Sequence, residues 1–212
     1  MNQNISKKQL AIVLSKLEGF REAKVRVEQY TTDSEIAADL LWNASILGDI
    51  EEKVIVDLGA GTGILGIGAL LIGAKQVLFI ESENSALEIA KENLELVKHL
   101  IKGKSEFILK DIINFNQKAD VVIQNPPFGT KSEHADKIFL EKAFETASII
   151  YSFHKVSTDS FIEAFSRDKG FEITHFWQYK FPIKASFDFH TKKIHRIDVG
   201  LYRLAKVAIQ NK

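Results

Sequence analysis

The sequence predicts an α/β fold in which helices cover both faces of a mostly parallel sheet. Three observations support it. Short apolar stretches alternate with helical stretches from residue 54 onward, a glycine-rich turn follows the first apolar stretch, and two long strand-like segments come last. Such alternation requires crossover connections, which place successive strands parallel in one sheet. We therefore expect seven strands, with the last two forming a β-hairpin at the sheet edge.

The individual elements follow from apolar periodicity and from capping residues. Ser6 and Gln9 predict a capping box for a helix that stops at Gly19, and Asp33 or Ser34 caps a second helix that ends at Gly48. Further helices are expected at 64–72, 85–100, 135–148 and near 159–167. Strands are expected at 54–58, 76–80, 106–109, 120–123, 149–153, 171–181 and 194–202.

The length and composition favour a single domain, 1–212, with an N-terminal helical cap at 1–48 and a basic hairpin at 175–212. Apolar residues make up 45% and charged residues 26%, which excludes a disordered chain. The longest apolar run, 64–74, is too short to cross a bilayer, so we expect a cytoplasmic protein without membrane contact. The chain has no cysteine, which excludes disulfides and cysteine zinc sites, and we expect no bound metal.

The net charge of zero hides an uneven distribution. Residues 175–212 carry eight Lys or Arg against two Asp, a net charge of +6, so the rest of the chain carries −6. A basic segment on an acidic body predicts contact with a polyanion. A solvated sheet edge is the alternative interpretation.

The glycine-rich turn at 59–63 follows an apolar strand and precedes a helix. Gly61, Gly63 and Gly66 match the dinucleotide-binding fingerprint, and Glu81 lies 20 residues after Gly61, where a ribose-binding acid belongs. A nicotinamide enzyme is therefore one interpretation. Asp57 lies just before the turn, however, and a carboxylate there favours a cationic ligand such as S-adenosylmethionine over a pyrophosphate. The expected cofactor residues of this region are Asp57, Gly59, Gly61, Gly63, Glu81 and Asp111.

The tetrapeptide Asn125-Pro126-Pro127-Phe128 follows the fourth expected strand. Its two prolines fix the backbone, so Asn125 and Phe128 are held in a set relation. An amino group on an aromatic ring is a poor nucleophile because its lone pair is delocalised. The Asn125 amide oxygen and the Pro126 carbonyl could accept both of its hydrogens while Phe128 stacks on the base. The tetrapeptide thus predicts methyl transfer to a base amine, achieved by positioning without a strong general base.

On these residues the chain resembles class I S-adenosylmethionine-dependent methyltransferases, whose fold is Rossmann-like with a seven-stranded sheet. More narrowly, it resembles the archaeal and eukaryotic family of rRNA adenine-N6 methyltransferases that act on small-subunit rRNA. Other matching stretches are 28–30 with Thr32, 151–155 and 187–193. The chain departs from the family at Glu81, where many members carry Asp, and at Thr31, where proline is common.

The resemblance implies methylation of adenine N6 in structured RNA. It implies that Gln29, Tyr30 and Thr32 close over the cofactor and that Asn125 lies beside it. It also implies a small zinc-binding activator protein that covers apolar surface at a sheet edge. The residues expected to contact RNA are Lys131, Lys184, His190, Lys192, Lys193 and Arg196.

Three other interpretations stay open at this point. A DNA adenine methyltransferase usually carries a target-recognition domain that 212 residues do not accommodate. Protein glutamine methyltransferases usually have Tyr where this chain has Phe128. A non-catalytic RNA-binding subunit could also retain the fold, although Asp57 and Asn125 argue against lost activity.

Overall fold

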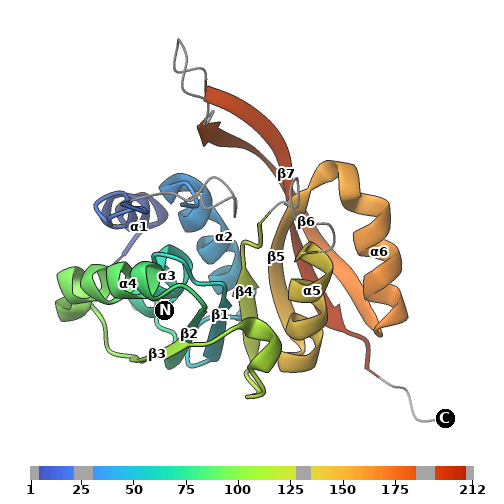
Figure 1. Ribbon diagram of the computed structural model, residues 1–212, viewed down its shortest axis with the longest axis horizontal. Coiled ribbons are helices and arrows are strands. Elements are labelled where there is room, and N and C mark those ends of the chain that lie inside the picture. The colour runs from blue at the N-terminus through green and yellow to red at the C-terminus, as the bar shows by residue number, and fades with distance from the viewer. Residues whose placement is uncertain (1–4, 22–30, 128–134, 185–193, 209–212) are drawn as a thin grey trace.

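A computed structural model describes residues 5–21, 31–127, 135–184 and 194–208 (Figure 1). It contains one seven-stranded sheet with the order β3-β2-β1-β4-β5-β7-β6. The five parallel strands are β1 (Val54–Leu58), β2 (Gln76–Glu81), β3 (Lys104–Leu109), β4 (Val121–Gln124) and β5 (Ile149–Lys155). The antiparallel strands β6 (Phe171–Lys184) and β7 (Ile194–Lys206) complete it, with β7 between β5 and β6. The expected α/β fold with a hairpin at the sheet edge is confirmed.

Helices cover both faces of the sheet. On one face lie α1 (Lys7–Leu14), α2 (Ser34–Ile46), α3 (Ile64–Leu71) and α4 (Asn84–Val97), and on the other lie α5 (Ala135–Thr146) and α6 (Asp159–Asp168). Alternate strand residues supply the two cores, because side chains along a strand point to opposite faces. Ile55 of β1 belongs to the first core and Val56 to the second.

The element boundaries differ from the expected ones by a few residues. The expected helix 85–100 ends as α4 at Val97 and continues as a 3-10 turn, Lys98–Leu100. The fourth strand begins at Val121, one residue later than expected, and the Asp120 carboxylate accepts a hydrogen bond of 2.8 Å from the Val54 backbone nitrogen. Asp33 caps α2, and the capping box of Ser6 and Gln9 is present.

The sheet order places two loops side by side. β1 pairs with β2 on one side and with β4 on the other, and Leu58 lies opposite Gln124 in the β1–β4 register. Since these strands are parallel, the glycine turn after β1 and the tetrapeptide after β4 emerge at the same edge. This is the position at which open α/β sheets bind their ligands.

The hairpin strands extend beyond the rest of the sheet, and their distal ends project at the top of Figure 1. The Tyr179 hydroxyl of β6 donates to Asp39 of α2 at 2.5 Å, which ties the hairpin to the helical layer. Within the residues that the structure describes, no helix is long and apolar enough to span a membrane. The same residues contain no cluster of three or more His, Cys, Asp or Glu side chains that could hold a metal ion.

Candidate active site

A cavity of about 270 Å³ lies at the carboxyl ends of β1, β2 and β4. It brings together most of the described residues that the sequence predicted for the site, among them Asp57, Glu81 and Asn125. Its lining includes Phe20, Thr31, Thr32, Asp57, Gly59, Gly61, Glu81, Asp111, Ile112, Asn125, Pro127 and Phe139. Gly63 and Pro126 do not line it; Gly63 is instead the N-cap of α3, with a φ of 86°.

The glycine turn is held against the end of β2. The backbone nitrogens of Gly59 and Ala60 both donate to the Ile80 carbonyl at 2.9 Å. Gly59 and Gly61 have φ values of 69° and 55°, in the left-handed region that favours glycine. A Cβ on Gly59 would lie 2.7 Å from Cε1 of Phe139. The turn therefore requires glycine for both its conformation and its close packing.

Asp57 is a buried carboxylate in the cavity wall. Its Oδ2 accepts a hydrogen bond of 2.8 Å from the Gly66 backbone nitrogen in the first turn of α3. Burial raises the pKa of Asp57 to about 7; the Gly66 hydrogen bond opposes this rise and the nearby Glu81 carboxylate adds to it. The Asp57 carboxylate thus stabilises the start of α3, while burial disfavours its ionised form. A cationic ligand would favour the ionised form.

The other two carboxylates of the cavity also bind backbone nitrogens. Glu81 accepts from Gly61 at 2.9 Å through Oε2 and from Ser82 at 2.7 Å through Oε1. Asp111 caps the 3-10 turn Ile112–Asn114, accepting from the Ile113 nitrogen at 2.9 Å. Oε1 of Glu81 also accepts from the Ser82 hydroxyl and the Glu83 nitrogen, so it is fully used. Each carboxylate oxygen has about two acceptor positions, so Oε2 of Glu81 and the Asp111 carboxylate can still accept hydroxyl or amino hydrogens from a ligand.

Asn125 lies directly after β4, where its side chain meets a residue from the N-terminal part of the chain. Its Nδ2 donates to Oγ1 of Thr32 at 2.9 Å. Thr32 is buried, and Pro126 is buried beside Asn125. The structure thus joins Thr32, which the resemblance placed at the cofactor, to the residue expected to bind the methyl acceptor.

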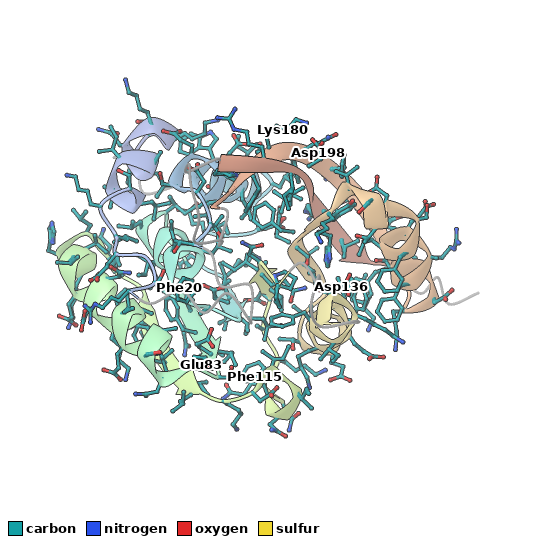
Figure 2. All side chains as sticks on the ribbon, turned by 45° about the horizontal axis from the view of Figure 1, so that its top comes forward. Phe20, Glu83, Phe115, Asp136, Lys180 and Asp198 are labelled. Atoms are coloured by element: carbon teal, nitrogen blue, oxygen red, sulfur yellow. The ribbon has the colours of Figure 1, made fainter. Side chains whose placement is uncertain are left out.

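Several predicted site residues lie outside the described part of the chain. These are Gln29, Tyr30, Phe128, Lys131, His190, Lys192 and Lys193. Lys184 is the last residue of β6, and Arg196 is exposed on β7. Lys180, which belongs to the basic segment, pairs with Asp198 across the hairpin at 2.6 Å (Figure 2), so part of the basic charge is neutralised locally.

Phe20 and Asn93 contribute to the site although the sequence analysis did not select them. A Cβ on Gly61 would lie 3.0 Å from Cζ of Phe20, whose ring lines the cavity. Asn93 holds the Phe20 segment in place: its side chain binds the backbone nitrogen and carbonyl of Glu18 and the Thr62 carbonyl. Asn93 is a polar residue on the apolar face of α4, and this irregularity could have identified it. No sequence signal marks Phe20.

Comparison with known proteins identifies the family. The model of the methyltransferase small domain matches residues 33–149. The chain belongs to the methyltransferase small-domain family. The predicted methyltransferase activity and fold are therefore confirmed. The cofactor of this family is S-adenosylmethionine.

Individual relatives cover nearly the whole chain. It is 33% identical to the rRNA N6-adenosine-methyltransferase METTL5 of Danio rerio, over 92% of this chain and 97% of that one. It is 32% identical to the protein of the same name in Drosophila melanogaster, over 90% and 92% of the two chains. A crystal structure from Pyrococcus horikoshii, provisionally described as an RNA methyltransferase, is 48% identical with a TM-score of 0.89, and the match covers 96% of this chain and 99% of that one.

Proposed function

We propose that this protein transfers the methyl group of S-adenosylmethionine to N6 of an adenine in structured RNA, most specifically in small-subunit rRNA. The observation that carries the proposal is the position of Asn125 on the cavity that holds the glycine turn and Asp57. The similarity to rRNA N6-adenosine-methyltransferases over nearly the full chain supports adenine as the acceptor. The proposal includes action in the cytoplasm, where ribosomes function.

The cavity residues fit the proposed cofactor. Asp57 and Glu81 line it together, and their mutual repulsion contributes to the raised pKa of Asp57. A ligand with an ammonium group, a sulfonium centre and ribose hydroxyls would relieve that repulsion and fill the remaining acceptor positions. A pyrophosphate would add negative charge beside the two carboxylates, which disfavours a nicotinamide cofactor. We propose that Asp57 and the turn hold the amino-acid part and that Glu81 holds the ribose.

The chain's part in the reaction is to bind and orient the amine. When bound, S-adenosylmethionine supplies an electrophilic methyl group whose departure leaves a neutral thioether. Asn125 lines the cavity, and its amide oxygen accepts one amine hydrogen. The carbonyl of the adjacent Pro126, which is outside the cavity lining, is proposed to accept the other when the base is bound, and the two bonds restore the nitrogen lone pair as a nucleophile. The N–C bond forms as the S–C bond breaks, and one amine proton passes to water. Alignment of these atoms provides most of the acceleration.

A methyl-transfer assay tests the function directly. The protein is incubated with labelled S-adenosylmethionine and total RNA from its source, and the nucleosides are then separated. Label in N6-methyladenosine of small-subunit rRNA is expected, and Asn125→Ala should lose most turnover while its cofactor affinity stays within about threefold. Label in DNA or in protein glutamine, when either replaces RNA in the assay, or an Asn125→Ala variant as active as the parent, would contradict the proposal.

We also propose that a small zinc-binding activator protein docks at the β3 edge of the sheet. β3 is an edge strand, and large apolar side chains are exposed on it and on neighbouring segments: Leu96, Leu100, Leu109 and Ile113. Co-purification from the native source should recover such a protein, and Leu109→Lys should release it. A fully active protein that gains nothing from the partner would contradict this part of the proposal.

A further inference from the structure

The side chain of Asn125 needs a partner to fix its orientation. Pro126 restricts the backbone after Asn125, but the terminal torsion of an Asn side chain is broad. The carboxamide presents an oxygen on one side and a nitrogen on the other, and only the oxygen can accept an amine hydrogen. A rotation of 180° about that torsion would turn the donor toward the substrate amine. The proposed reaction therefore depends on which way this amide points.

In the structure, Thr32 accepts a hydrogen bond from one end of this amide. Asn125 donates through Nδ2 to the Thr32 hydroxyl at 2.9 Å, which directs Oδ1 away from Thr32. Thr32 is only 5% exposed, so water does not readily replace it. The geometry points to Thr32 as a positioning residue, whose hydroxyl holds the Asn125 carboxamide with its oxygen toward the methyl-acceptor amine. This inference rests on the proposed function.

The position of Thr32 is itself well fixed. Thr32 directly precedes Asp33, the N-cap of α2, whose Oδ1 accepts from the Glu35 nitrogen at 2.9 Å and the Ile36 nitrogen at 3.3 Å. The start of a core-packed helix therefore anchors the hydroxyl that meets Asn125. The role differs from the one implied by family resemblance, in which Thr32 closes over the cofactor. Thr32 and Asn125 both line the cavity, so Thr32 could act on the cofactor or on Asn125. Experiment must separate these two roles of Thr32.

Substitutions at Thr32 separate them. Thr32→Val keeps the shape of the side chain but removes the hydroxyl. It should lower kcat about 10- to 100-fold while the Kd for S-adenosylhomocysteine changes less than about threefold, and Thr32→Ser should restore most of kcat. The double variant Thr32→Val/Asn125→Ala should be no slower than Asn125→Ala alone, because coupled residues are not additive.

Thr146→Val is the matched control. Thr146 is another buried threonine, and its hydroxyl donates to the Lys142 carbonyl at 2.7 Å within α5. This variant should lose some stability but keep kcat. A Thr32→Val variant with a tenfold weaker Kd and an unchanged kcat at saturating cofactor would overturn the inference in favour of the cofactor role.

A measurement without turnover keeps this inference distinct from the proposed function. In ¹⁵N-labelled protein, the Asn125 side-chain amide hydrogens should exchange at least about tenfold faster in Thr32→Val than in the parent. Unchanged exchange would overturn the assignment. Failure of the parent protein to methylate RNA would contradict the proposed function, whatever the amide signal shows.

Discussion

Asp57 is hydrogen-bonded to the Gly66 backbone and is also buried in the cavity wall. These two features have opposite effects on the pKa of its carboxyl group. The Gly66 hydrogen bond favours the carboxylate, whereas burial disfavours it more strongly, so the pKa rises to about 7. A cationic ligand would shift the balance back toward the carboxylate. Ligand binding and proton release should therefore be coupled at this residue.

Cofactor affinity should depend on pH near neutrality. Below pH 7 the free protein carries a proton on Asp57 that a cationic ligand must displace. The affinity for S-adenosylmethionine should then fall as pH decreases from 7.5 to 5.5, by up to about tenfold per pH unit below the pKa. Calorimetry in buffers of different ionisation enthalpy should show proton release on binding. A pH-independent Kd without proton release would contradict this prediction.

Asp57→Asn should stabilise the protein at alkaline pH. In the parent, the folded-state pKa of about 7 exceeds the ordinary value of 3.8, so the folded state binds more protons between these values and stability falls as pH rises through them. The substituted carboxamide would not titrate, and its oxygen could still accept from Gly66. Relative to the parent, the variant should gain stability between pH 5 and pH 8, by at most about 3 kcal/mol, and bind cofactor more weakly.

Urea unfolding at the two pH values measures this gain. An Asp57→Asn variant whose stability relative to the parent is the same at pH 5 and pH 8 would show that the carboxylate is ionised in the folded protein throughout.

At the scale of single elements, α3 contains Gly66 in its interior, although glycine has a low helix propensity. Alanine is normally favoured over glycine inside a helix by about 1 kcal/mol. At Gly66, however, a Cβ would lie 2.3 Å from Cε1 of Phe79 and 3.0 Å from Oδ2 of Asp57. The small residue therefore permits both the helix–sheet packing and the Asp57 hydrogen bond.

Gly66→Ala should destabilise the protein by about 1–3 kcal/mol through overpacking, and should also weaken cofactor binding because Asp57 is displaced. Thermal unfolding and calorimetry measure the two effects. Gly170→Ala is the control: its φ is 76°, but nothing lies within 4 Å of an added Cβ, so it should cost only about 1 kcal/mol of backbone strain. A Gly66→Ala variant more stable than the parent would contradict the packing argument.

The ends of β4 and β5 contain a buried polar trio. Gln124 Nε2 donates to Ser152 Oγ at 2.9 Å, and Ser152 Oγ lies 2.6 Å from Nε2 of His154. Burial lowers the pKa of His154 to about 3, so the imidazole stays neutral. Among the described residues, the buried Gln124 Oε1 atom has no hydrogen-bond partner, so burying this trio costs stability.

Variants of this trio should differ in stability. Ser152→Ala leaves Gln124 Nε2 and His154 Nε2 unpaired and should cost about 1–3 kcal/mol. Gln124→Leu removes the unpaired oxygen and should change stability by less than about 1 kcal/mol. Denaturant midpoints with unchanged m-values provide the comparison. Equal losses in the two variants would contradict this account.

The sequence was sufficient to predict those features that depend on residues close together in the chain. The glycine turn, the capping box at Ser6 and the order of strands and helices follow from residue spacing alone. The contact between Thr32 and Asn125 and the position of Phe20 over Gly61 could not be predicted, because they join segments distant in the chain. β6 and β7 end later than the apolar pattern indicated, at Lys184 and Lys206, because residues 182–184 pair with 194–196 and residues 203–206 pair with β5 and the start of β6.

At the scale of the whole molecule, charge is distributed unevenly between an acidic body and the basic segment 175–212. The hairpin strands are also tied to the body by an ion pair: Arg203 of β7 binds Asp49 at 2.7 Å, and the Tyr151 hydroxyl donates to the same carboxylate. A basic hairpin tied to the body in this way would attract RNA through its phosphates.

Charge reversal at Lys192 and Lys193 should weaken RNA binding and reduce its salt dependence. Each lost phosphate contact lowers the logarithmic slope by about 0.7 to 0.9, and cofactor affinity should not change. Titrations at several salt concentrations measure the slope. Lys91→Glu/Lys98→Glu on α4 and the turn that follows it is the control with equal charge change, and it should leave the slope unaltered. An unchanged slope in the hairpin variant would place RNA on another surface.

The place of β7 in the sheet has a consequence for how the chain is made. β7 follows the other described strands in the sequence, yet it lies between β5 and β6. During translation, β5 therefore keeps an unpaired edge until β7 has been synthesised, and β6 has no strand with which to pair. Unpaired apolar edges promote association with other chains. Cotranslational folding can complete only the parallel part of the sheet, and nascent chains that stop before Ile194 should aggregate.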